Sequence, residues 1–231
     1  SGNAAIYEIK PDGTIVGSTD MLALGRELGI QQGLTGAALT AFTDKFADLE
    51  GIAIDPATRT LYAAIDDDGV GKFGLAEIGR QVVAIRLEDA PDNTGRLAFK
   101  DSFAFTDEAG VSASVTPERG LQGDGITFNA TTGTLFVART DDPDGTGPLP
   151  RVQSVLQFNT NGTYINEFAF SAAQVPAGIT TLPNGNLLIA SPNPIAGGAF
   201  DGKIIEVTTT GTVVAGGINF DLPDAFNDRN Q

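Results

Sequence analysis

Hydrophobic and polar positions alternate in three segments that share one pattern, residues 51–64, 125–138 and 178–190. Each segment opens with a glycine, continues with alternating residues, breaks at a polar turn and ends in a more apolar run. In the first segment the turn begins at Asp55 and Pro56, a pair that favours chain reversal. Alternation on both sides of a turn is typical of a β-hairpin. The pattern therefore predicts one hairpin type three times.

A second hairpin type alternates with the first and occurs four times. Each copy has an apolar strand, a polar turn and a returning strand. The four copies cover residues 5–16, 82–99, 155–165 and 204–214. Between the first two hairpins, residues 19–28 have the spacing of a short helix with Thr19 as its cap, and we expect this helix to cover an end of the sheets.

Two consecutive hairpins make a four-stranded antiparallel meander, the unit that repeats as a blade in β-propellers. We therefore expect an all-β fold in which residues 1–231 form a single β-propeller domain built of four-stranded antiparallel blades. The three hairpins of the first type would be the inner strands of the blades, and the four of the second type the outer strands. Counted in this way, the chain holds about three complete blades plus a half.

A half blade needs an explanation, because a closed propeller usually has at least four blades. The chain could be a fragment of a larger protein, its missing blades could come from self-association or a second chain, or diverged strands could lie within residues 34–46 and 97–115. Open blade edges attract other strands. This argument favours a fragment or an assembly-completed propeller.

Composition removes several classes of function. The chain has no cysteine and no histidine, which excludes disulfides, thiol chemistry, Cys/His zinc sites and catalytic triads that need an imidazole. With 14 basic and 29 acidic residues its formal charge is −15, so nucleic acids and anionic membrane surfaces would be repelled. No apolar run approaches the length of a membrane span. We expect neither nucleic-acid binding nor membrane insertion.

The segment 48–56 followed by residues 60–64 resembles β-propellers of the SdiA-regulated domain and esterase-like phytase types, and more distantly regucalcin/gluconolactonase and NHL-repeat propellers. The likeness covers residues 48–220. It implies an exported bacterial protein, extracellular or at the cell surface, with the periplasm as the alternative. Blades of this kind carry many unrelated activities, so the likeness indicates fold more than function.

In regucalcin-like propellers an acidic residue just before an inner strand helps to hold a divalent metal at the mouth of the central channel. Glu50 and Asp124 match this pattern, whereas Ala177 departs from it in the third copy. Because calcium takes six to eight oxygen ligands, the two carboxylates would need additional carbonyl, amide or water ligands. The alternative is that both carboxylates are solvated or hydrogen-bonded.

Two acidic runs are expected in equivalent loops, each directly after the second strand of an inner hairpin. A glycine-containing loop with several carboxylates can bind calcium, but neither run has the spacing of an EF-hand. A solvent-facing charged loop is the alternative. The candidate calcium ligands in these runs are Asp66, Asp67, Asp68, Asp141, Asp142 and Asp144.

The sequence favours a secreted or cell-surface binding or structural module, stabilised by calcium and forming oligomers. The alternative is a metal-dependent hydrolase of phosphate esters or lactones, in which Glu50 and Asp124 would serve a metal-bound water. No residue is assigned as a catalytic nucleophile. Sugar recognition has little support, because the chain has no tryptophan and only three tyrosines.

Overall fold

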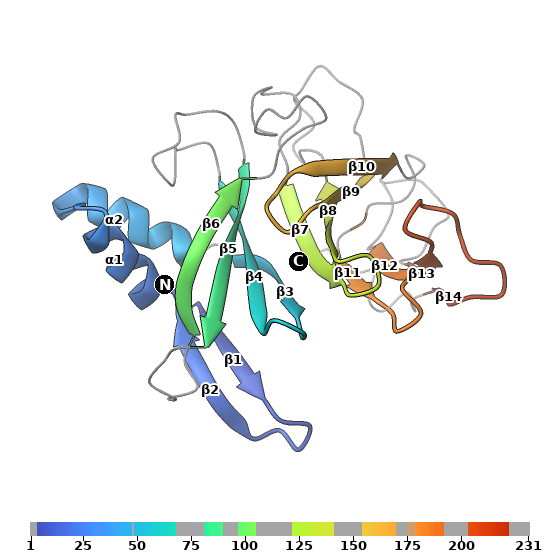
Figure 1. Ribbon diagram of the computed structural model, residues 1–231, viewed down its shortest axis with the longest axis horizontal. Coiled ribbons are helices and arrows are strands. Elements are labelled where there is room, and N and C mark those ends of the chain that lie inside the picture. Colours follow the sequence, from blue (N-terminus) through green and yellow to red (C-terminus); the bar gives the residue numbers. More distant parts are fainter. Residues whose placement is uncertain are drawn as a thin grey trace, which may run out of the picture.

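Three four-stranded antiparallel sheets form the body of the computed structural model (Figure 1). The structure describes residues 4–47, 49–67, 81–89, 97–104, 122–140, 154–169, 176, 178–191 and 203–221. In each sheet the strands follow one another in sequence order, so each is a meander of two hairpins. We call the sheets blades 1, 2 and 3. The expectation of an all-β fold built of four-stranded antiparallel blades is confirmed.

The strands of the blades have the following bounds. Blade 1 contains β3 (Leu49–Asp55), β4 (Thr60–Asp67), β5 (Gln81–Asp89) and β6 (Leu97–Ala104). Blade 2 contains β7 (Gln122–Asn129), β8 (Thr134–Thr140), β9 (Ser154–Phe158) and β10 (Tyr164–Ala169). Blade 3 contains β11 (Gly178–Thr181), β12 (Leu187–Ser191), β13 (Lys203–Val207) and β14 (Asn219–Asp221).

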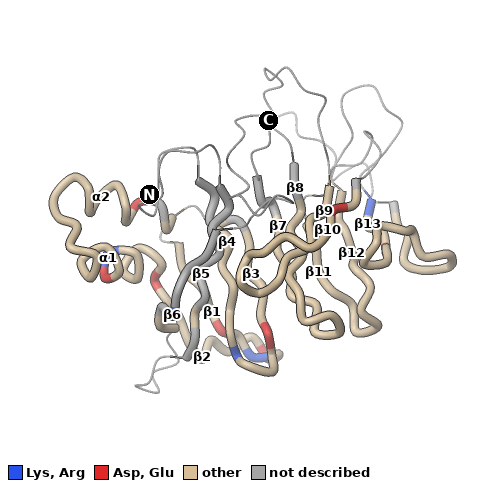
Figure 2. Tube along the Cα trace, turned by 45° about the horizontal axis from the view of Figure 1, so that its top comes forward, with Lys and Arg blue, Asp and Glu red and all other residues tan. Residues whose placement is uncertain are grey.

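Alternation along the strands places one face of each blade against its neighbour. From blade 1, Ala53, Tyr62 and Ala64 pack against Ile126 and the rest of a cluster in blade 2. A second cluster joins blade 2 to blade 3 in the same way. The inner strands β3, β7 and β11 lie next to one another, and Figure 2 shows the blades in a row. The row is therefore built by repeating a single blade-to-blade interface.

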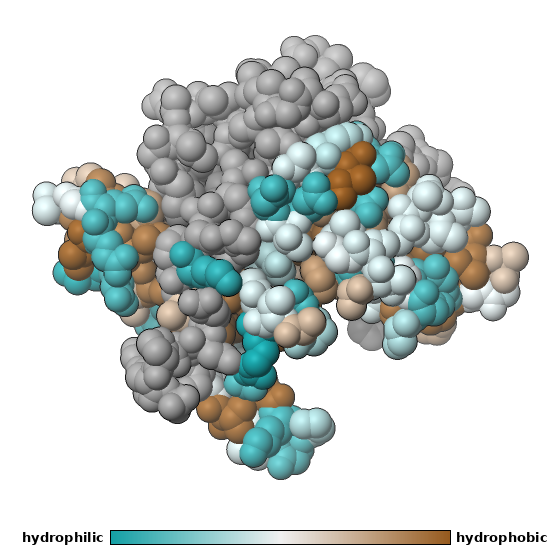
Figure 3. Space-filling model, viewed as in Figure 1, coloured by the Kyte–Doolittle hydropathy of each residue, from teal (hydrophilic) through white to brown (hydrophobic). Residues whose placement is uncertain are grey.

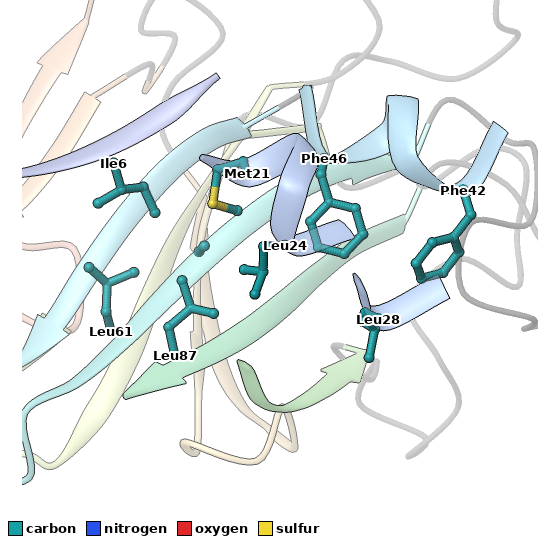
Figure 4. Close-up of a cluster of buried hydrophobic side chains, with 9 residues drawn as sticks. Ile6, Met21, Leu24, Leu28, Phe42, Phe46, Leu61 and Leu87 are labelled. Carbon is teal, nitrogen blue, oxygen red and sulfur yellow. The ribbon is translucent and has the colours of Figure 1, made fainter. Parts of the chain in front are cut away.

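The other face of blade 1 is covered by the N-terminal segment rather than by another blade. This segment comprises the two-stranded hairpin of β1 (Ala5–Ile9) and β2 (Ile15–Asp20), the helices α1 (Met21–Gln31) and α2 (Gly36–Asp44), and a 3₁₀ turn at Lys45–Ala47. Figure 4 shows the cluster that it forms with blade 1. The helical cover was expected, although only its first helix was predicted.

The first helix begins one residue later than predicted. Asp20 caps α1 by accepting a hydrogen bond from the Ala23 N–H at 3.0 Å. Thr19, the predicted cap, belongs to β2, and its hydroxyl accepts a hydrogen bond from the Leu97 N–H at 2.8 Å. Gly25, a poor helix former, is explained by packing, because a Cβ at this position would overlap the ring of Phe46.

Two further expectations about strands are wrong. Residues 34–46 hold α2 and the start of the 3₁₀ turn, so they contain no diverged strand. In blade 3 the partner strand of β13 is β14, whereas residues 211–214 contribute only a bridge between Val207 and Val213. The loop before β14 folds back on β13, where Glu206 N–H donates to the Ile218 carbonyl.

Candidate functional site

The acidic residues predicted to bind metal divide into two groups. Asp68, Asp141, Asp142 and Asp144 lie outside the described residues. For Asp66, Asp67, Glu50 and Asp124 the structure describes the backbone but not the side chains. Asp66 and Asp67 are not in a loop as expected: they end strand β4 and pair with Val82 and Gln81. The calcium site in these runs stays a prediction.

Glu50 and Asp124 occupy equivalent positions in the backbone of two neighbouring blades. Leu49 pairs with Ile65 and Gly51 with Ala64, so Glu50 is an extra residue in β3. Asp124 is likewise the extra residue between Gly123 and Gly125 in β7. Both residues therefore lie within an inner strand at a β-bulge, rather than just before it, and bulges often re-aim a side chain near a functional site.

The same two strands approach each other closely beside these bulges. A Cβ built on Gly51 would lie 3.1 Å from the Ile126 nitrogen and 3.4 Å from the Gly125 Cα. Glycine at position 51 thus lets β3 and β7 come together. The chain positions of Glu50 and Asp124, each one residue before these glycines, are brought side by side on adjacent strands.

Asn129, an amide of the type that could have completed a calcium site, is committed to structure. It is fully buried, and its Nδ2 donates to the Gly185 carbonyl of blade 3 at 2.7 Å. Its Oδ1 accepts hydrogen bonds from the N–H groups of Thr131 and Thr132 at 3.0 and 3.3 Å. This side chain closes its own turn and ties blade 2 to blade 3.

Glu206 on β13 is a second polar side chain that sequence patterns did not single out. Its carboxylate accepts hydrogen bonds from Asn186 Nδ2 at 2.7 Å, Ile218 N–H at 3.0 Å and Asn184 Nδ2 at 3.0 Å. These bonds, with the Asn186 bond contributing most, lower the pKa of Glu206 below its ordinary value. The alternating pattern of β13 could have predicted which sheet face Glu206 lies on. It could not have predicted its hydrogen-bond partners, because they come from loops distant in sequence.

Among the described residues, no group of three or more Asp and Glu side chains could hold a metal ion. The described helices include none that is long and apolar enough to span a membrane.

An apolar groove of about 330 Å³ lies between the hairpin β1–β2 and the inner strand of blade 1. β1 forms one wall with Ile6–Ile9, and β3 forms the other with Ile52–Ile54. Ile52 and Ile54 are 48% and 57% exposed, although both point to the same face of blade 1 as the buried Leu61. The groove therefore exposes an apolar part of a sheet face that is elsewhere covered.

Comparison with solved structures finds likenesses to β-propellers. The Dos1 propeller is 12% identical with a TM-score of 0.46, covering 94% of this chain and 42% of that one. A chain of the nidogen/laminin complex is 15% identical with a TM-score of 0.48, covering 93% and 58%. A protein of unknown function from Bacteroides caccae is 13% identical with a TM-score of 0.45, covering 94% and 54%. The fold is distantly similar to β-propellers.

The chain spans about half the length of these three proteins. No protein-family model and no curated protein matches it. The comparisons thus concern the fold alone.

Proposed function

We propose that the chain is a binding or structural module of the β-propeller type that associates with further polypeptide through the ends of its row of blades. The observation that carries this proposal is the position of the exposed apolar side chains. Among the described residues, most of the large exposed apolar side chains belong to the N-terminal segment, β3 and the final segment of blade 3. Figure 3 shows apolar residues on the protruding hairpin β1–β2.

At the first end these side chains belong to the hairpin β1–β2, to α1 and to β3. They are Tyr7, Ile9, Ile15, Val16, Ile30, Ile52 and Ile54. At the other end they belong to the final segment of blade 3, and they are Val213, Ile218 and Phe220. Concentrated exposed apolar side chains favour association, and open sheet edges favour it further.

The association part is tested by sedimentation velocity of the purified chain over a wide concentration range. Phe220 is 52% exposed, so Phe220→Asp should fold normally and weaken any association through blade 3. The matched control is Ile165→Asp, at an isoleucine that is 41% exposed on β10 between the two ends. A monomer at every concentration, together with a natural reading frame that adds no residues, would contradict the proposal.

We further propose export to the cell surface or the extracellular space, and stabilisation by calcium. The support is the resemblance to propellers of the SdiA-regulated and esterase-like phytase types, together with a formal charge of −15 that attracts cations. An export signal in the natural gene would support export, and recovery of the protein only from the cytoplasm would contradict it.

A metal-dependent hydrolase of phosphate esters or lactones is the second candidate. It is favoured by the equivalent bulges that hold Glu50 and Asp124 on adjacent strands. In that function Glu50 and Asp124 would hold a divalent metal, and the metal would supply an activated water for hydrolysis. Turnover that is lost both with a chelator and in Glu50→Gln would support it. No turnover with calcium, magnesium, manganese or zinc would contradict it.

A further inference from the structure

The apolar residues of the groove have counterparts in blade 2 that are covered. Ile52 and Ile54 follow Gly51 by one and three residues, as Ile126 and Phe128 follow Gly125. Ile126 is only 3% exposed, since it packs in a cluster with Ala53 from β3 of the preceding blade. The inner strand of the preceding blade therefore covers these positions in blade 2. No described strand covers them in blade 1.

The hairpin β1–β2, which has the strand–turn–strand pattern of the outer hairpins, lies beside this uncovered part of blade 1. β2 lies beside β6, where Leu97 N–H donates to the Thr19 hydroxyl at 2.8 Å. β1 lies toward the inner strands, as Figure 1 shows. Among the described strands only β2 pairs with β1, so the other edge of β1 has no strand partner in the described part of the chain. An open strand edge can accept another strand.

We propose that the groove binds a β-hairpin of the inner type, supplied by a partner polypeptide. The first strand of this hairpin covers Ile52 and Ile54, and the second pairs with the open edge of β1. The partner's hairpin and the hairpin β1–β2 together make one four-stranded blade. This inference rests on the proposed function, because it names the partner that associates at the first end of the row.

The existing blade interface defines the chemistry of that partner. Gly51 faces Ile126 so closely that a Cβ would lie 3.2 Å from Ile126 Cγ2, and Ala53 follows two residues later. The partner strand therefore needs glycine at the position facing Ile52 and a small residue two positions later. A complete blade from a second copy does not fit, because β1–β2 already lies beside the uncovered part of blade 1.

A peptide copying residues 178–191 is a suitable probe, since it is an inner hairpin with glycine at 178, threonine at 180 and no charged residue. It is added to the full chain in linear and head-to-tail cyclised form, because isolated hairpins are marginally stable and cyclisation cuts the ordering cost. Calorimetry measures its association constant, and hydrogen exchange measures protection of amides 6–9. We expect saturable binding and slower exchange at these amides.

The matched variants are Ile54→Asp in the groove and Ile165→Asp on β10, both at exposed isoleucines. We expect Ile54→Asp to lower the association constant at least tenfold, and Ile165→Asp to change it less than twofold. Equal effects of the two variants would overturn the inference. Absence of saturable binding by both peptide forms, or protection of blade 3 in place of amides 6–9, would also overturn it.

The same variants separate this inference from the proposed function. A chain that dimerises through the groove, with dimers lost in Ile54→Asp, would identify a second copy as the occupant and overturn the hairpin partner. Association that survives Ile54→Asp but is lost in Phe220→Asp would likewise overturn the groove assignment while leaving the proposed function intact. Association unaffected by either variant would contradict both.

Discussion

The contact between blades 2 and 3 depends on one buried amide. Asn129 donates from Nδ2 to the Gly185 carbonyl at 2.7 Å, while its Oδ1 accepts from two N–H groups of its own turn. In the equivalent turn of blade 1, Asp55 Oδ1 accepts from the Ala57 N–H and Oδ2 from the Thr58 hydroxyl. The exchanges Asn129→Asp and Asp55→Asn therefore measure separately how much the side chain contributes to its own turn and how much it contributes to the contact between blades.

Asn129→Asp keeps the turn acceptor and removes the donor to Gly185. The buried carbonyl of Gly185 then loses its partner, which costs about 1–3 kcal/mol, and a carboxylate oxygen facing it adds to this loss. We expect Asn129→Asp to lower the free energy of unfolding by about 2–4 kcal/mol. Asp55→Asn should cost less than about 1 kcal/mol, since the new amide can donate to the Thr58 hydroxyl, whose single proton can then be donated to the Thr60 hydroxyl instead.

Urea unfolding followed by far-ultraviolet circular dichroism at pH 7 measures both variants against the parent chain. The expected order of stability is parent, then Asp55→Asn, then Asn129→Asp. Asn129→Ala, which removes the turn bonds as well, should be at least as unstable as Asn129→Asp. Equal stabilities for the two exchange variants would refute the assignment of Asn129 as the link between blades.

Three further predictions concern other parts of the chain. Gly51→Ala should lower the free energy of unfolding by about 1–3 kcal/mol, because the added methyl group overpacks β3 against β7. Gly178→Ala, whose Cβ would meet Ala190 at an ordinary 3.4 Å, should cost less in the same urea titration. Because its folded-state pKa is lowered, the Glu206 carboxylate should stabilise the fold above its ordinary pKa of 4.5 and lose this contribution as the pH falls further. The difference in unfolding free energy between the parent and Glu206→Gln should therefore shrink in acid. A difference that stays constant with pH would contradict the role of these hydrogen bonds. If the acidic runs bind calcium, the ion should raise the melting temperature of the parent and raise it less in Asp67→Ala or Asp142→Ala; no rise in the parent would remove the site.

Sequence patterns predicted the repeating architecture because it depends on local alternation. Glycine followed by alternating residues marks β3, β7 and β11, and the turn residues mark where each hairpin reverses. The predicted cap of α1 was one residue too early because Thr19 and Asp20 are both good caps, and only the hydrogen bond from Leu97 decides between them.

The parts that the sequence did not predict depend on contacts between distant residues. Glu206 receives hydrogen bonds from residues 184, 186 and 218, and Asn129 reaches a carbonyl 56 positions away. The bulges at Glu50 and Asp124 depend on the register of paired strands, which the pattern of a single strand does not specify. The groove was missed because Ile52 and Ile54 have the pattern of buried residues, yet both are exposed and no strand of the described segments covers them.

The most direct test of the account concerns the isoleucine methyl groups of blade 1. In a chain with methyl-labelled isoleucine, a soluble paramagnetic agent should strongly relax Ile52 and Ile54 and leave Ile126 and Ile189 nearly unaffected, since the first pair is exposed and the second is buried. Addition of the cyclised inner hairpin should then protect Ile52 and Ile54. Protection of these two methyl groups in the dilute chain alone, to the same degree as Ile126, would contradict the account.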